Sequence, residues 1–319
     1  MKHYILGTDE AGYGPNLGPF TLACTQWEIP ENAFNDRHDD LELLHELLAG
    51  VVTDTPPSRK EKSSGIVIGD SKKIYTSIKS LDVLHNTLFQ MLALLGRFPK
   101  NWPELLQMLA PQDKNCVLQD YFSEQLFTTD DVDMDSAGGF AERGVTLREI
   151  QARVITPRVF NESLKRLGNK SCLLTEYTLE LITAQLEDIA SGQITIICDK
   201  HGGRNHYVDI LYHWFPEHPI KIMTEGREAS IYRFGPESRQ IEFRFLAKAD
   251  RMIPTGLASM TSKYLRERAM EIFNRFWTEK IPHLKPTAGY PVDAVRFYGK
   301  IKEEAAKLGI PQSSLWRER

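Results

Sequence analysis

Residues 4–19 read YILGTDEAGYGPNLGP and change character half-way along. The first five residues alternate between two faces, as in a β-strand, and the acids Asp9 and Glu10 follow at once. The glycines and prolines after them predict a tight turn. Residues 20–27 (FTLACTQW) are again strand-like, and such a turn places this second strand antiparallel to the first.

Further strand-like runs alternate with stretches that have helical periodicity. Apolar or alternating runs predict strands at residues 65–68, 147–155, 194–198, 220–224 and 240–247. Apolar residues at helical spacing predict helices over 81–95 and 173–189 and from Thr255 onward. Thr156 and Pro157 predict the start of another helix, as its cap and first residue. This alternation is typical of an α/β protein.

Composition excludes several classes of protein. The chain has 319 residues, with 39 Lys and Arg against 43 Asp and Glu, and its net charge is −4. No apolar run approaches the roughly 18 residues of a membrane span, and no signal peptide is recognisable, so we expect a cytoplasmic protein without membrane contact. The four cysteines form no C-x-x-C pair and predict neither disulfides nor a zinc site. Because the chain is acidic, a polyanionic substrate would need a local basic patch or metal ions.

Three strand-like segments end in acids, namely Asp9 with Glu10, Asp199 and Asp250. Any one of them could simply cap a turn. Acids from several strands can also meet at one edge of an α/β sheet, where they would repel one another unless cations joined them. Mg²⁺ is suited to such a cluster, and two such ions can promote phosphodiester hydrolysis. Because neighbouring strand residues face opposite sides, Asp9 and Glu10 can share a site only if the strand twists out at the glycines.

Several short motifs resemble, in order, those of the type 2 ribonuclease H family (ribonuclease HII and HIII). The family opens with Asp-Glu-(small)-Gly-Arg-Gly-Pro, and residues 9–15 here read DEAGYGP, followed by Leu17-Gly18-Pro19. The other matches are Asp70-Ser71-Lys72-Lys73, the strand-end acid Asp199, Lys248-Ala249-Asp250, Ala258-Ser259 with Ser262, Lys263 and Arg266, and Gly289-Tyr290-Pro291.

This resemblance implies an RNase H-like fold, with a mixed central sheet flanked by helices. It implies a catalytic core over residues 1–254, with insertions at about 28–64, 97–146 and 202–240, and a helical substrate-binding subdomain over 255–319. The implied catalytic and metal-binding acids are Asp9, Glu10, Asp199 and Asp250. The implied substrate-binding residues are Gly12, Tyr13, Gly14, Lys72, Lys73, Lys263 and Tyr290.

The resemblance further implies an endoribonuclease that uses Mg²⁺ or Mn²⁺, with two ions in the substrate complex. Its substrates would be RNA/DNA hybrids or DNA containing ribonucleotides, and its products would carry 5′-phosphate and 3′-hydroxyl ends. We expect a monomer. Two alternatives stay open, namely a nuclease of the same fold with altered substrate preference and a non-catalytic nucleic-acid-binding module.

Two features leave room for other interpretations. Tyr13 replaces the family's Arg, which puts cleavage at single ribonucleotides in question, and Tyr290 could be an ordinary packed turn residue. The basic residues of the C-terminal helices could be a solvated surface or the local basic patch that the acidic chain requires. They are Arg266, Arg268, Arg296, Lys300, Lys302 and Lys307.

Overall fold

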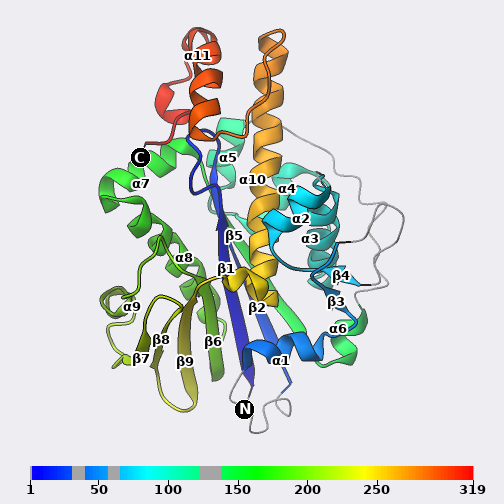
Figure 1. The fold of residues 1–319 in the computed structure, drawn as a ribbon, viewed down its shortest axis with the longest axis vertical. Helices are drawn as coiled ribbons and strands as arrows, with labels where there is room; N and C mark the ends of the chain where they lie inside the picture. Colours follow the sequence, from blue (N-terminus) through cyan, green and yellow to red (C-terminus); the bar gives the residue numbers. More distant parts are fainter. Residues whose placement is uncertain (1, 31–39, 57–64, 79, 122–137, 319) are drawn as a thin grey trace.

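The computed structural model describes residues 2–30, 40–56, 65–78, 80–121 and 138–318. Its centre is a seven-stranded mixed sheet of order β5-β2-β1-β6-β9-β8-β7 (Figure 1). The strands are β1 (His3–Ala11), β2 (Phe20–Ile29), β5 (Thr146–Ile155), β6 (Gly192–Asp199), β7 (Lys221–Glu225), β8 (Ala229–Phe234) and β9 (Arg239–Leu246). The short strands β3 (Val52–Thr53) and β4 (Ile66–Val67) form a separate parallel pair.

The direction of the strands determines where loops gather. Strands β1, β6 and β9 run parallel to one another, whereas β2 is antiparallel to β1 and β5, and β8 is antiparallel to β7 and β9. The carboxyl ends of β1, β6 and β9 therefore meet at one edge of the sheet. This is the edge to which the sequence assigns its acids.

Helices cover both faces of the sheet. One face carries α10 (Ile253–Lys280), which packs against β1, β2 and the helix α3 (Asp82–Leu94). The other face carries α8 (Lys170–Leu186), which packs on β2 and β5. The remaining helices are α1 (Asp40–Leu47), α2 (Ser71–Ile78), α4 (Trp102–Leu109), α5 (Lys114–Tyr121), α6 (Gly138–Glu142), α7 (Pro157–Leu167), α9 (Val208–Trp214), α11 (Pro291–Lys307) and the 3₁₀ turns η3 (Ala249–Arg251) and η4 (Gln312–Ser314).

The alternation along β1 divides the core into two parts. Ile5 belongs to the apolar cluster on the α10 side, while Tyr4 and Leu6 belong to the cluster on the α8 side. Gly7 permits α10 to approach closely, because a Cβ there would lie 2.3 Å from the carbonyl carbon of Pro254. Thr25 fixes the same contact by donating its hydroxyl to the carbonyl of Pro254 (2.8 Å). The start of α10 is thus held against the middle of the sheet.

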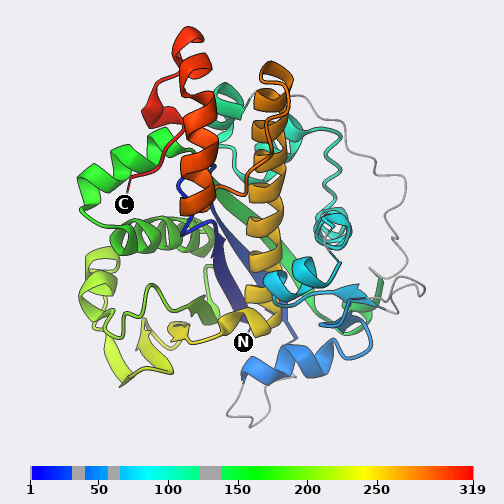
Figure 2. The ribbon, with the colours of Figure 1, turned by 45° about the horizontal axis from the view of Figure 1, so that its top comes forward.

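The C-terminal end of α10 extends past the sheet and runs beside α11 (Figure 2). The rings of Phe273 and Phe297 join the two helices, with centroids 5.6 Å apart. The proposed division after residue 254 falls inside α10, two residues from its first residue, Ile253. A helical C-terminal subdomain over 255–319 therefore stays a prediction.

The observed architecture confirms the predicted fold class of a mixed sheet flanked by helices. It also contains elements that the sequence did not indicate. Strand β8 lies inside the expected insertion at 202–240, and α4 and α5, which pack on β5, lie inside that at 97–146. Parts of the expected insertions, residues 31–39, 57–64 and 122–137, fall outside the described residues. In the described part of the chain no helix has the length and apolar character that crossing a membrane requires.

Candidate active site

The strand register places two of the predicted acids side by side. Asp9 lies in β1 and Asp199 is the last residue of β6. Thr8 pairs with Cys198 in the parallel ladder, so Asp9 and Asp199 are lateral neighbours on the same face of the sheet. Asp250 follows β9, the next strand along, within η3. We name Asp9, Glu10, Asp199 and Asp250 the acid edge.

The acids repel one another and are partly removed from water. Burial raises the pKa of Asp9 well above its usual range, and the charge of Glu10 adds to the effect. Burial, with repulsion from Asp199, raises the pKa of Glu10 to about 7. Burial and the charges of Asp70 and Asp199 also raise the pKa of Asp250. A cation placed among these side chains would relieve this repulsion.

The sequence allowed Glu10 to share a site with Asp9 only if β1 twisted out of the sheet at the glycines. The β1–β2 ladder continues through Asp9 and Glu10 to Ala11, so β1 has not twisted out of the sheet before the acids. By strand alternation their side chains leave opposite faces, although Glu10 still experiences the charge of Asp199. Within the described residues no three His, Cys, Asp or Glu side chains are grouped as metal ligands. The oxygen donors of Asp9 and Asp199 nevertheless fit Mg²⁺, which needs only one or two carboxylates beside water and substrate phosphate.

Two lysines lie close to the acid edge. Lys72 and Lys73 are exposed at the start of α2, where Asp70 Oδ1 accepts their backbone N–H groups at 2.9 and 3.2 Å. A hydrogen bond between Ser71 Oγ and Ser259 Oγ (2.9 Å) ties this helix start to α10. The charge of Lys72 opposes the rise in the pKa of Glu10. The charges of Lys72 and Lys73 also oppose the rise in the pKa of Asp250, so both predicted lysines lie near that acid.

Lys263 has a different environment. Its Nζ lies 2.7 Å from Glu267 Oε1 and 4.7 Å from the centre of the Tyr75 ring. The side chain is half-buried on α10. Contact between Lys263 and substrate stays a prediction.

Two buried arginines pack against the turn after β1. Gly12 has φ +83°, and a Cβ there would lie 2.5 Å from Arg266 Nε. Arg266 is 2% exposed and donates to the carbonyl of Ala288 (2.8 Å). Arg317 donates to the carbonyls of Gly12 (2.6 Å) and Pro15. Arg266 therefore belongs neither to a solvated surface nor to a basic patch, the two alternatives that the sequence left open. It joins the turn at Gly12 to the segment at Ala288.

A third segment completes this arrangement. Gly289 accepts hydrogen bonds from the backbone N–H groups of Asn16 (2.8 Å) and Leu17 (3.2 Å). A Cβ on Gly14 would lie 4.0 Å from Cε1 of Tyr290, so the tyrosine stands next to the turn. Tyr290 is 54% exposed, which does not suit a packed turn residue. We name residues 12–17, 288–290, 316–317 and Arg266 the turn junction.

Tyr13 has its ring half-buried against Phe20, at 6.1 Å between centroids. Burial and the charge of Glu10 raise the pKa of its hydroxyl, and Arg204 acts in the opposite direction. The predicted residues Gly12, Tyr13, Gly14 and Tyr290 therefore occupy one region, adjacent to the acid edge. Sequence reasoning missed Arg317 and Arg204, because neither belongs to a recognisable motif.

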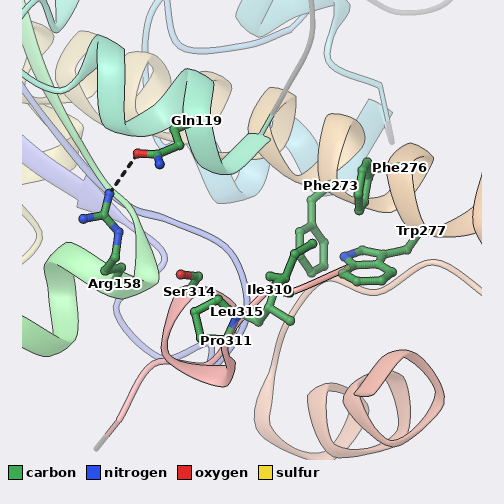
Figure 3. A pocket seen from close by; sticks show the side chains of 10 residues that line it. Gln119, Arg158, Phe273, Phe276, Trp277, Ile310, Pro311, Ser314 and Leu315 are labelled. Atoms are coloured by element: carbon green, nitrogen blue, oxygen red, sulfur yellow. Dashed lines mark hydrogen bonds between the residues drawn. The ribbon is translucent and has the colours of Figure 1, made fainter. Parts of the chain in front are cut away.

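A separate cavity lies away from the predicted residues (Figure 3). Its volume is about 500 Å³, and it opens between α10, α5, α7 and the C-terminal residues 309–315. Its walls are largely aromatic and aliphatic, from Phe273, Phe276, Trp277, Ile310, Pro311 and Leu315. None of the predicted site residues lines it, so we do not place the active site there.

Comparisons with known proteins find similarity to solved structures at low sequence identity. No protein-family model and no curated protein sequence matches the chain. Among solved structures, the ribonuclease H2 of Pyrococcus horikoshii OT3 is 15% identical, with a TM-score of 0.46, over 99% of this chain and 92% of that one. The RNase HII in the PCNA:RNase HII complex of Archaeoglobus fulgidus is 14% identical, with a TM-score of 0.40, over 99% and 94%. Aquifex aeolicus RNase H3 is 14% identical, with a TM-score of 0.42, over 98% and 71%.

Proposed function

We propose that this protein is an RNase H-type endoribonuclease dependent on a divalent metal ion. The observation that carries the proposal is the acid edge, where strand register makes Asp9 and Asp199 neighbours and burial raises the pKa of Asp9, Glu10 and Asp250. Such a concentration of carboxylates is unfavourable without cations and typical of a site that uses them. The motifs DEAGYGP, DSKK and GYP support the same assignment.

The residues of the chain would divide the work as follows. Asp9 and Asp199 would hold the metal, Mg²⁺ or Mn²⁺, with Glu10 and Asp250 completing its surroundings. A divalent ion bound there supplies positive charge that activates water and stabilises the phosphate in the transition state. Lys72 and Lys73 would position the phosphate of the cleaved strand as flexible point charges.

The turn junction would read the sugar of the ribonucleotide. The backbone of Gly12 to Gly14 can approach a substrate closely, and main-chain groups can recognise a 2′-hydroxyl. Tyr290, exposed beside Gly14, offers a ring on which that sugar can pack. The substrates would be RNA/DNA hybrids or DNA with embedded ribonucleotides, and hydrolysis would leave 5′-phosphate and 3′-hydroxyl ends.

The decisive experiment is hydrolysis of an RNA/DNA hybrid in Mg²⁺ or Mn²⁺ by wild type and by Asp199→Asn. Asparagine keeps the oxygen that accepts the Ala249 N–H (3.1 Å), so the variant should stay folded while cleavage is lost. Asp188→Asn is the matched control, because this exposed acid precedes β6 at the opposite end of the strand. Undiminished cleavage by Asp199→Asn would disprove the assignment.

Tyr13 gives a reason to keep a second candidate, a nuclease of the same fold with altered substrate preference. Duplexes with one ribonucleotide, with four and with an all-RNA strand separate the two. If the turn sets the preference, Tyr13→Arg should shift cleavage toward the single ribonucleotide. A non-catalytic binding module would instead bind hybrids, take up no Mg²⁺ or Mn²⁺ and cut none of the three.

A further inference from the structure

The loop after Asp199 carries an arginine, Arg204, that has no carboxylate partner among the described residues. After Asp199 the chain turns through Gly202 and Gly203, both in the left-handed region (φ +59° and +79°), and reaches Arg204. The Arg204 side chain is half-buried, so part of its hydration is already lost. A guanidinium in such a place is normally paired with a carboxylate.

Among the described residues, the side chain of Arg204 contacts neutral groups. Its Nη1 donates to Thr175 Oγ1 at 3.3 Å, its Nη2 lies 4.0 Å from Cys172 Sγ, and its Cζ lies 5.8 Å from the centre of the Tyr207 ring. In the described part of the chain it forms no ion pair. Glu176, the residue after Thr175, pairs with Arg166 at 3.0 Å.

A second hydrogen-bond donor, the hydroxyl of Tyr13, faces the same loop. A Cβ on Gly202 would lie 3.8 Å from Tyr13 Oη and 3.9 Å from Ser171 Oγ. The Tyr13 hydroxyl makes no hydrogen bond within the described residues. The charge of Arg204 acts on Tyr13, and that of Glu10 does as well. Tyr13 is therefore near both Glu10 and Arg204.

We propose that Arg204 and the Tyr13 hydroxyl together bind one backbone phosphate of the nucleic-acid strand, beside the acid edge. A guanidinium without a counter-ion and a phenol without an acceptor supply two donors suited to the oxygens of a phosphodiester. The assignment of this phosphate to nucleic acid rests on the proposed function. The site itself rests on the contacts of Tyr13 and Arg204.

The test measures binding without cleavage, in an Asp199→Asn background. A fluorescent RNA/DNA hybrid is titrated at several salt concentrations with and without Arg204→Ala. Loss of one phosphate contact should weaken binding and lower the slope of log K against log salt by about 1. Arg148→Ala, which removes an exposed arginine of the edge strand β5, is the matched control and should leave the slope unchanged.

Neutral methylphosphonates, placed one at a time along the hybrid, identify the phosphate. At one position the methylphosphonate should weaken binding to the protein that keeps Arg204. The same methylphosphonate should not weaken binding to the Arg204→Ala variant any further. Tyr13→Phe, which keeps the ring against Phe20, should weaken binding less, act at the same position and be non-additive with Arg204→Ala. A structural role alone would lower the melting temperature without this selectivity.

The results separate the two proposals. An unchanged salt slope in Arg204→Ala, or methylphosphonate effects that Arg204→Ala leaves intact at every position, would overturn the phosphate site even if the wild type cuts the hybrid. A selective loss at one phosphate would support the site even if the wild type cuts nothing, in which case only the proposed nuclease activity fails.

Discussion

The acid edge and the turn junction lie next to each other and have opposite effects on stability. At the acid edge, like charges gather and burial raises the pKa of Asp9, Glu10 and Asp250. At the turn junction, buried arginines donate to backbone carbonyls, including those of Gly12 and Ala288. The first region costs stability in the absence of a cation, whereas the second contributes stability and fixes the turn. The difference fits the proposed function, in which the turn junction fixes the turn and a bound cation would offset the repulsion at the acid edge.

The largest expected effect is at the acid edge. If the proposed function holds, Asp9→Asn should lower hydrolysis of an RNA/DNA hybrid by at least about 1000-fold, since it removes a proposed metal ligand. The same substitution should raise the metal-free melting temperature by about 2 °C, because it removes a carboxylate that burial and Glu10 disfavour. Steady-state kinetics and calorimetric melting in EDTA measure the two effects. A lower metal-free melting temperature would contradict the claim that these acids are held at a cost.

The next effect breaks the turn junction. Arg317→Ala should destabilise the protein by about 3 kcal/mol, because the carbonyls of Gly12 and Pro15 lose their buried donor. The control is Lys307→Ala. The Lys307 side chain is 72% exposed and pairs with Glu304 (3.0 Å), so its loss should cost less than about 0.5 kcal/mol. Urea unfolding gives both values. Equal costs would mean that Arg317 does not hold the turn.

The smallest effect separates packing from backbone strain. Gly12→Ala should cost about 2 kcal/mol, because the new Cβ meets Arg266 Nε and the carbonyl of Pro19 (2.9 Å) in addition to the unfavourable φ. Gly50 has nearly the same φ (+81°) and nothing within 4 Å, so Gly50→Ala should cost only about 1 kcal/mol. The difference between the two unfolding free energies is the packing contribution. A difference near zero would show that Arg266 yields easily to the added methyl group.

Much of the fold could be predicted from local sequence pattern. The strict alternation of residues 4–8 gave β1 and its two faces, and the β-branched run 194–198 gave β6 with Asp199 at its end. Strand β8, which lies between β9 and the edge strand β7, was missed because only six residues, 229–234, alternate. Charged residues and glycines flank this short run on both sides, so its pattern resembles a loop. Helices α4 and α5 were missed because both are only eight residues long and lie among prolines and acids.

Only part of the candidate site could be predicted from the sequence. Asp9 and Asp199 could be placed together because parallel strands bring their carboxyl ends to one edge. The role of Arg317 could not be predicted, since its contact with Gly12 joins residues 305 positions apart. Arg204 could not be predicted either, because its lack of a carboxylate partner among the described residues depends on packing and not on sequence spacing.

The most direct test of the central claim is the effect of Mn²⁺ on thermal unfolding of wild type and of Asp9→Asn, without substrate. If the acid edge is a divalent-cation site, Mn²⁺ at about 100 times its dissociation constant should stabilise the wild type by about 2.7 kcal/mol and Asp9→Asn far less. An equal shift in both proteins, or no shift in the wild type at any Mn²⁺ concentration, would contradict the account.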